Sequence, residues 1–221
     1  LVTFEHEKEE VQRAGWTYLV ATHVGTAFLF ALFALLGQIN GSLDFSTFGS
    51  SPDAAAGVLF ILAVIGFGTK AGFMPLHVWL PEAHPAAPSH VSAVMSGVMI
   101  KTGIYGLVRV LTFLGPPAPW WGLTLVGVGL SSGILGVLFA LAQHDLKRLL
   151  AYHSVENIGI IALGLGLGLL GVSYGQPAVA VAGFAGALLH VINHAVFKGL
   201  LFLGAGAVAH APGTREIDHL G

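Results

Sequence analysis

The sequence predicts an all-α protein, a polytopic bundle of membrane-spanning helices. Hydrophobic residues make up 55% of the 221 residues and charged residues only 9%, whereas soluble domains carry about 25% charged residues. The mean hydropathy is +0.81. Apolar stretches of about 20 residues, the length that crosses a bilayer, follow one another along the chain. We therefore expect a single transmembrane domain over residues 1–221.

Charge and cysteine content exclude several other functions. The formal net charge is −2, so the chain lacks the excess of basic residues that binds nucleic acid. There is no cysteine, which excludes disulfides, thiolate metal ligands and a cysteine nucleophile. The chain begins with leucine rather than methionine, and no signal peptide is recognisable. We expect an internal piece of a longer protein, truncated at both ends.

About six apolar segments are long enough to be spanning helices, and the second is interrupted. Polar or Pro/Gly-rich connections such as "PEAHPAAP" and "LGPPAPW" separate them. Glycine occurs 31 times, and close packing between membrane helices suffices to explain most of these glycines. The expected spans cover residues 14–37, 55–81, 89–112, 120–143, 147–172 and 178–209.

Basic residues gather on one side of the membrane when the six segments are threaded through it. Only Arg109 falls on the other side. The positive-inside rule makes the first side cytoplasmic, so both ends of the chain are expected in the cytoplasm. The residues on that side are Lys8, Arg13, Lys147, Arg148 and Arg215.

The second segment should break near its middle. In "VIGFGTKAGFMPLHVWLP", Pro75 cannot donate a hydrogen bond to the carbonyl of Ala71, and its ring clashes there. Broken helices in transporters commonly line ion sites, because non-helical backbone is tolerated only inside protein or beside water. Lys70 precedes the break, and a lysine at this depth is a candidate functional residue. Alternatively, Lys70 snorkels to the membrane interface.

Lys101 falls about halfway along the third segment. No acidic residue lies within one turn of it, so we expect its partner to come from another helix or from water. Low-dielectric surroundings disfavour the charged form of a lysine, so a buried lysine can load and release a proton near neutral pH. The alternative is a structural lysine that caps carbonyl groups.

The stretch "HVINHAVFKGLLF" carries His190, His194 and Lys198 at intervals of four residues. This spacing stacks the three side chains along one helix face. Histidine titrates at about pH 6.5, so such a row can relay protons along the helix. Core histidines are one alternative. The His-x-x-x-His spacing also fits a metal site, but a third ligand is missing and Lys198 would repel a cation, so we expect no metal.

Secondary candidates lie at the start of the fifth segment and beside the Pro-rich connection. Lys147 and Arg148 resemble anchors at the cytoplasmic surface, whereas His153, Glu156 and Asn157 lie deeper. Glu156 is either the counter-charge of a buried lysine or a packing residue, and the sequence favours neither. The remaining polar residues fix the connection or line a proton exit: His77, Glu82, His84 and His90.

Three stretches resemble one superfamily of membrane proteins. They are "GTKAGFMPLHVWLPEAHPAAPSHVSAVMSGVMIKTGIYGLVRV", "HDLKRLLAYHSVENIGI" and "LLHVINHAVFKGLLFLGAG". They resemble the antiporter-like proton-translocating subunits of respiratory complex I, Mrp sodium/proton antiporters and group 4 hydrogenases. "FEHEKEEVQRAGWTYLVATH", "MSGVMIKTGIYG" and "AYHSVENIG" are most similar to the large antiporter-like membrane subunits of hydrogenase-4 and formate hydrogenlyase.

The resemblance implies two inverted five-helix repeats, each with a broken helix that carries a proton-channel lysine. Lys70 matches the lysine of the first broken helix. Lys101 matches a lysine on the next helix, and Ser96 stands where other members have a histidine. Lys147 matches a lysine at the start of a helix in the second repeat. The row His190, His194 and Lys198 matches the series that links the half-channels.

Two expected parts of the proton path are missing from the chain. The glutamate that pairs with the broken-helix lysine should lie upstream of Leu1, and the second broken helix should lie downstream of Gly221. We therefore do not expect this piece to pump protons alone.

The predicted function is proton translocation by a non-catalytic membrane subunit of a redox-driven complex, of hydrogenase-4, formate hydrogenlyase or NADH:quinone oxidoreductase type. We expect no cofactor in this chain, redox centres in partner subunits, and a place in a bacterial or archaeal cytoplasmic membrane beside other membrane subunits. Three alternatives remain open: a subunit of an Mrp-type sodium/proton antiporter, a structural anchor of a hydrogenase, and a metal-binding membrane protein that uses His190 and His194.

Overall fold

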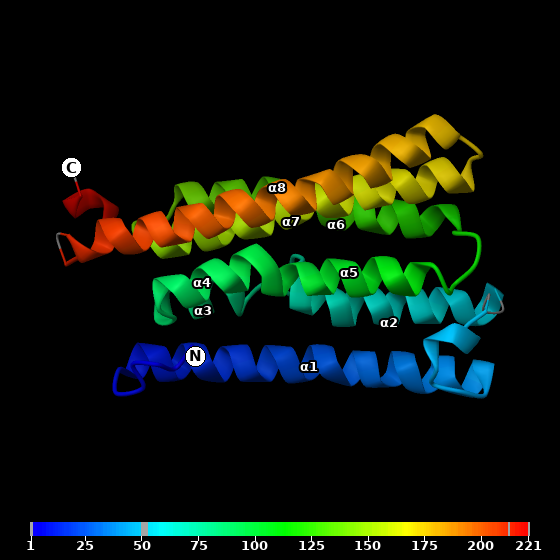
Figure 1. Ribbon diagram of the computed structural model, residues 1–221, viewed down its shortest axis with the longest axis horizontal. Coiled ribbons are helices and arrows are strands. Elements are labelled where there is room, and N and C mark those ends of the chain that lie inside the picture. The colour runs from blue at the N-terminus through cyan, green and yellow to red at the C-terminus, as the bar shows by residue number, and fades with distance from the viewer. Residues whose placement is uncertain (1, 50–52, 212, 221) are drawn as a thin grey trace.

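The computed structural model describes residues 2–49, 53–211 and 213–220, and these contain helices and no β-strand. The helices lie roughly parallel in layers, with α6, α7 and α8 on one side, α2 to α5 in the middle and α1 on the other side (Figure 1). Their bounds are α1 Glu9–Asn40, α2 Asp53–Ala71, α3 Leu80–Ala86, α4 Ser89–Val94, α5 Ile100–Leu111, α6 Pro119–Leu141, α7 Leu146–Ser173 and α8 Pro177–His210.

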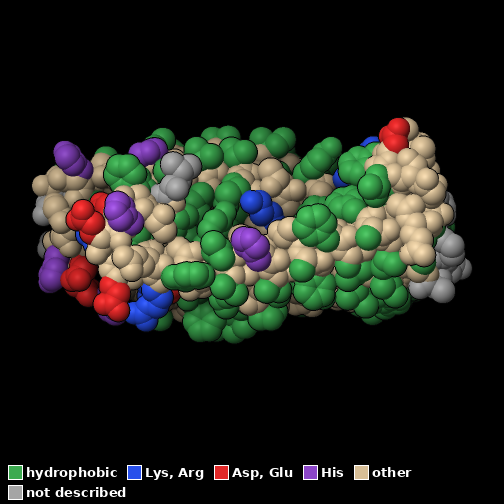
Figure 2. Space-filling model, turned by 90° about the horizontal axis from the view of Figure 1, so that it is seen from below, with side chains coloured by type: hydrophobic (Ala, Val, Ile, Leu, Met, Phe, Trp, Pro, Cys, Tyr) green, Lys and Arg blue, Asp and Glu red, His purple; other side chains and the backbone are tan. Residues whose placement is uncertain are grey.

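The predicted all-α membrane bundle is confirmed. Five helical runs are long and apolar enough to cross a membrane, and the helix over Ala55–Ala71 is shorter but apolar. Apolar side chains cover the central length of the molecule, whereas charged side chains and histidines gather mainly at one end (Figure 2). Both ends of the chain lie at that same end of the bundle (Figure 1).

The predicted break in the second segment is also confirmed. Helix α2 ends at Ala71, and Gly72 has a φ of +87°, a left-handed conformation that glycine adopts without a steric cost. The Met74–Pro75 peptide bond is cis. The indole Nε1 of Trp79 donates a 2.8 Å hydrogen bond to the carbonyl of Thr69. The side chain of Trp79, which follows the break, therefore binds the backbone of α2, which precedes it.

One local prediction is wrong, and one confirmed span has an irregular helix. The stretch "PEAHPAAP", expected as a connection, forms most of α3, because Pro81 occupies the first turn, where a missing N–H costs nothing. The third segment is not a regular α-helix throughout. A π-helical turn over Met95–Met99, labelled η2, joins α4 to α5, and such turns are frequent at functional sites.

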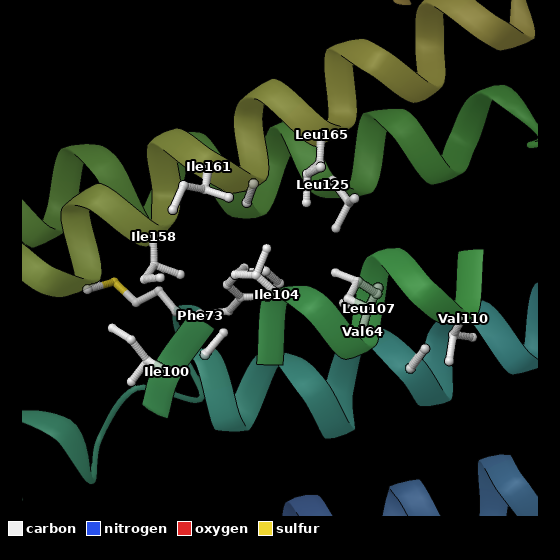
Figure 3. Close-up of a cluster of buried hydrophobic side chains, with 14 of the residues drawn as sticks. Val64, Phe73, Ile100, Ile104, Leu107, Val110, Leu125, Ile158, Ile161 and Leu165 are labelled. Carbon is white, nitrogen blue, oxygen red and sulfur yellow. The ribbon is translucent and has the colours of Figure 1, made fainter. Parts of the chain in front are cut away.

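The core lies between the α2–α5 layer and the α6–α7 layer (Figure 3). Ile104 and Leu107 on α5 point toward Leu125 on α6 and Ile158 and Leu165 on α7, and all five are nearly or fully buried. This apolar contact holds α5 against α7, and the polar groups described below lie on these two helices, on η2 and on α8.

Glycines bring α6 and α7 into backbone contact. A Cβ atom added at Gly129 would lie 2.6 Å from the amide nitrogen of Leu163, and one added at Gly159 would lie 2.6 Å from that of Gly133. Such distances are closer than real Cβ atoms approach. The glycines at this interface therefore allow close helix packing, which is the interpretation expected from the sequence for most glycines.

Candidate functional site

Buried hydrogen bonds link the segments that carry Lys101 and Lys198 by way of two serines. The Lys101 ammonium donates to the carbonyl of Ser96. The Ser96 and Ser154 hydroxyl oxygens lie 2.8 Å apart, and Ser154 also donates to the carbonyl of Leu150 at 3.0 Å. The Lys198 ammonium donates to that same Leu150 carbonyl at 2.9 Å. These bonds thus connect η2 and α5 to α8 by way of α7.

Both lysines are removed from the surface of the chain. The exposed fraction is 8% for Lys101 and 1% for Lys198. Burying a charge is costly unless it is paired or hydrogen-bonded, and backbone carbonyls supply that bonding here. The partner of Lys101 was expected from another helix or from water. That expectation is wrong for the hydrogen bond observed, because Ser96 belongs to the π-helical turn of the same segment.

The row of histidines on α8 meets a second polar group on α7. The rings of His190 and His194 are stacked with centroids 6.2 Å apart and planes inclined by 10°. His190 Nε2 lies 2.9 Å from Asn157 Oδ1, and Asn157 donates through Nδ2 to the carbonyl of His153 at 2.7 Å. His194 is fully buried, and neither of its ring nitrogens has a hydrogen-bond partner among the described groups.

Glu156 is bonded to a histidine rather than to a lysine. Its Oε2 lies 2.5 Å from Nδ1 of His153, one turn away on α7. The interpretation of Glu156 as the direct counter-charge of a buried lysine is therefore not what the structure shows.

Lys70 stands apart from both groups. It lies in the last turn of α2, is half-buried, and forms no hydrogen bond or ion pair with any described residue. The closest packing of α2 on α5 is nearby, since a Cβ added at Gly103 would lie 2.7 Å from the carbonyl oxygen of Phe67. The structure therefore places Lys70 beside the break, as predicted, but does not connect it to Lys101.

Lys147 is buried, so the interpretation of Lys147 as a surface anchor is wrong. Its exposed fraction is 3%, and its ammonium donates to the carbonyl of Ala87 in the α3–α4 connection. Helix α7 begins at Leu146 and packs on α3, and the bond to Ala87 ties its first turn to the α3–α4 connection. Arg148, the next residue, is half-exposed and forms an ion pair with Glu82 at 3.1 Å.

A polar cavity of about 560 Å³ opens beside Lys147 at the charged end of the bundle. Arg215 lines it, forms a 3.3 Å ion pair with Asp145 and donates to the carbonyl of Pro85. Glu5 also lines the cavity. Its carboxyl pKa is lowered from the ordinary value because the Lys8 side chain donates a hydrogen bond to it. The cavity connects Lys147 to a charged surface.

The remaining predicted residues do not form a common site, and neither do the histidines of the metal-binding alternative. His77 lies in the break between α2 and α3, with its ring centroid 6.2 Å from that of Tyr152. Among residues 2–49, 53–211 and 213–220, no group of three or more His, Cys, Asp or Glu side chains converges as a metal site requires. His190 and His194 gain no third ligand of this kind there.

Ser154 is the residue that sequence reasoning missed. A signal was available, because a hydroxyl in the middle of an apolar spanning segment must find a hydrogen-bond partner inside the protein. Ser154 lies one turn from Leu150, whose carbonyl it binds, and on the side of α7 that also carries Asn157. No comparable pattern in the sequence predicts the π-helical turn that presents Ser96.

Comparisons with known proteins agree with this architecture. The family described as NADH:quinone oxidoreductase/Mrp antiporter, TM, matches residues 1–221. Hydrogenase-4 component B of Escherichia coli is 49% identical over 228 residues, which cover 100% of this chain and 34% of the relative. Formate hydrogenlyase subunit 3 of the same species is 42% identical over 212 residues, covering 95% and 35%, respectively.

A solved structure has a similar fold. The Mrp complex of a Dietzia species contains a chain that matches with a TM-score of 0.82 and 25% identity, covering 94% of this chain and 37% of that one. The chain thus spans about a third of the length of these relatives. From the match over its whole length, the chain belongs to the NADH:quinone oxidoreductase/Mrp antiporter family of transmembrane proteins.

Proposed function

We propose that the chain is part of a membrane subunit that moves protons in a redox-driven complex of the hydrogenase-4 or formate hydrogenlyase type. The relatives at 49% and 42% identity carry those names. Redox centres lie in partner subunits, and this chain contributes buried proton-holding side chains. Within the whole protein, both ends of the chain face the cytoplasm, because the basic residues gather there.

The observation that carries the proposal is the connection between Lys101 and Lys198. Both lysines are buried, both bind backbone carbonyls, and a hydrogen bond between two serine hydroxyls links the segments that carry them. A carbonyl accepts a hydrogen bond but has no proton to pass on, so these bonds hold the two proton-holding lysines in one buried cluster, and transfer between them requires water or a movement of the lysine side chains. The stacked rings of His190 and His194 continue the same face of α8. Lys70 lies beside the helix break and supplies a further proton-holding group.

The test is proton uptake by inverted membrane vesicles that contain the full-length complex. Lys101→Ala and Lys198→Ala are compared with the unmodified complex, and each rate is divided by the amount of assembled complex. Arg109→Ala is the matched control, since Arg109 is an exposed basic residue on the same helix as Lys101. We expect both lysine variants to fall below about a tenth of the normal rate, the loss expected when a positioned acid–base group is removed.

A different result in these vesicles would support another function. Full proton uptake in both lysine variants would make the buried lysines structural and the chain a membrane anchor. A second candidate, sodium/proton exchange, is favoured by the similarity to the Mrp complex at a TM-score of 0.82. Exchange that requires sodium and continues without any electron donor would identify that activity instead.

A further inference from the structure

Arg215 binds two segments of the charged end that lie far from it in the sequence. Its guanidinium forms a 3.3 Å ion pair with Asp145 and donates to the backbone carbonyl of Pro85. Asp145 caps the start of α7, because its other carboxylate oxygen accepts a 2.9 Å hydrogen bond from the amide of Arg148. One guanidinium therefore joins the start of α7 to the C-terminal end of α3.

Backbone hydrogen bonds fix the position from which the Arg215 side chain reaches. The amide of Leu146 donates to the carbonyl of Arg215 at 3.0 Å, and the amide of Ile217 donates to the carbonyl of His144 at 2.8 Å. These two bonds form one short antiparallel bridge. The segment that follows α8 is therefore paired with the connection between α6 and α7.

The carbonyl groups at the end of α3 depend on donors from outside that helix. Helix α3 ends at Ala86, and Pro88 has no N–H to donate back to the carbonyl of His84. The Ser92 hydroxyl binds that carbonyl instead, at 2.9 Å. The last carbonyls of a helix have no partner within it, so the position of this helix end is set by the side chains that bind it.

Two basic side chains supply the other donors. Arg215 binds the carbonyl of Pro85, and the Lys147 ammonium binds that of Ala87. Positively charged donors suit the C-terminal end of a helix, where the unpaired carbonyls carry partial negative charge. Residues 85–88, which we call the α3–α4 junction, are thus held from the segment after α8 and from α7.

The α3–α4 junction also forms part of the wall of the polar cavity. All four of its residues line the cavity, as do Lys147 and Arg215. The Lys147 ammonium keeps its place beside the cavity only while the Ala87 carbonyl that binds it keeps its own. A displacement of the junction would break that bond and change the exposure of Lys147.

We propose that Arg215 is a positioning residue for proton exchange at Lys147: it holds the α3–α4 junction against the start of α7, and so keeps the Ala87 carbonyl on the Lys147 ammonium. This proposal rests on the proton-translocating function proposed above. Arg215 itself passes no proton, because a guanidinium is not deprotonated in proteins. Its planar group donates in fixed directions to two partners, whereas a lysine side chain is flexible, so Lys147 alone would leave the junction loosely held.

The first test is proton uptake by vesicles that contain the full-length complex with Arg215→Ala or Arg215→Lys. We expect Arg215→Ala to reduce uptake severalfold per assembled complex, because a proton-holding group out of place works poorly. Lysine keeps the charge and one donor group, so Arg215→Lys should restore part of the rate. Arg148→Ala is the matched control, since Arg148 forms a 3.1 Å ion pair between the same turn of α7 and Glu82 on α3 but does not line the cavity.

The second test follows the position of the α3–α4 junction through an introduced cysteine. The chain has no cysteine, and Ala87 is only 2% exposed, so Ala87→Cys should react slowly with a water-soluble maleimide in the purified complex. Labelling of the complex without this cysteine is subtracted. We expect the rate to rise severalfold when Arg215→Ala is added, and to stay unchanged when Arg148→Ala is added.

Asp145→Asn tests the same contact from its other partner. Asparagine still caps α7, but it lacks the charge that holds the guanidinium. We expect faster labelling of Ala87→Cys and slower proton uptake in this variant too. If Arg215→Ala does not assemble, Asp145→Asn decides in its place by the same two measurements.

Two results would overturn the role of Arg215. One is normal proton uptake by Arg215→Ala, and the other is a loss of uptake with an unchanged labelling rate of Ala87→Cys, which means that Arg215 does not act by holding the junction. Lys101→Ala is measured in the same preparation. If that variant loses uptake while Arg215→Ala keeps it, only the role of Arg215 fails. If both keep it, the proposed function fails as well.

Discussion

The hydroxyl oxygens of Ser96 and Ser154 lie 2.8 Å apart in the interior of the bundle. Ser154 donates its single proton to the carbonyl of Leu150, so Ser96 is the donor in the bond between the two serines. This bond is the link by which the π-helical turn before Lys101 reaches the carbonyl that binds Lys198. Loss of the Ser96–Ser154 bond should therefore break the link between the segments that carry the two lysines, without removing a charge.

Ser154→Ala tests this link directly. The substitution leaves both lysines in place but removes the hydroxyl bond that holds their segments together, so we expect the lysines to shift apart and proton uptake to fall severalfold per assembled complex. An unpaired buried hydroxyl remains on Ser96, at a cost of about 1–3 kcal/mol, so the melting temperature of the complex should also fall slightly. Uptake by vesicles and thermal unfolding in detergent are measured on the same preparation.

Ser131→Ala is the matched control for that experiment. The Ser131 hydroxyl is also in a spanning helix and also binds a carbonyl of its own helix, that of Val128 at 3.0 Å. It has no part in the link between the segments that carry the lysines. Equal uptake by the two serine variants would show that the 2.8 Å contact between Ser96 and Ser154 plays no part in proton uptake.

Lys70→Met separates a functional lysine from a structural one. Lys70 has no hydrogen bond or ion pair with the described residues, and an uncompensated charge in a membrane helix is unfavourable. Its removal should leave the melting temperature unchanged or raise it, while proton uptake collapses. A lysine with only a structural role gives the opposite pattern, a lower melting temperature with normal uptake.

Lys147→Met and Arg148→Met compare two neighbouring basic residues with different surroundings. Lys147 is buried beside the polar cavity, whereas Arg148 is half-exposed and paired with Glu82. An exposed ion pair contributes about 0–1 kcal/mol, so Arg148→Met should change stability and uptake little. We expect Lys147→Met to reduce uptake strongly. Similar losses in both variants would point to membrane orientation rather than to a path through Lys147.

The fold could be predicted almost completely from the sequence, because spanning helices must satisfy their backbone internally and reveal themselves as long apolar segments. The break after Lys70 was predictable for the same reason, from Pro75 and the glycines around it. Helix α3 was missed because prolines at positions 81 and 85 resemble a loop, although a proline in the first turn is compatible with a helix.

The polar network was only partly predictable. The spacing of His190, His194 and Lys198 places them on one face, and the structure confirms that His190 and His194 stack. Which helix faces that row depends on tertiary packing, so the partners Asn157 and Leu150 could not be derived. The burial of Lys147 was unpredictable too, because the cover comes from the connection that carries Ala87, 60 residues earlier.

Gly129→Ala tests whether the contact between α6 and α7 supports the site. The added Cβ would lie 2.6 Å from the amide nitrogen of Leu163 and 2.8 Å from the carbonyl oxygen of Gly159. Both neighbours are backbone, so the helices must separate, and overpacking of this kind costs about 1–3 kcal/mol. We expect a lower melting temperature of the complex, and reduced proton uptake because Ser154 is carried by the displaced helix.

Gly127→Ala is the control, since a Cβ at Gly127 on the same helix meets nothing within 4 Å. Equal melting temperatures for the two variants would show that α6 and α7 are not held at this distance in the membrane.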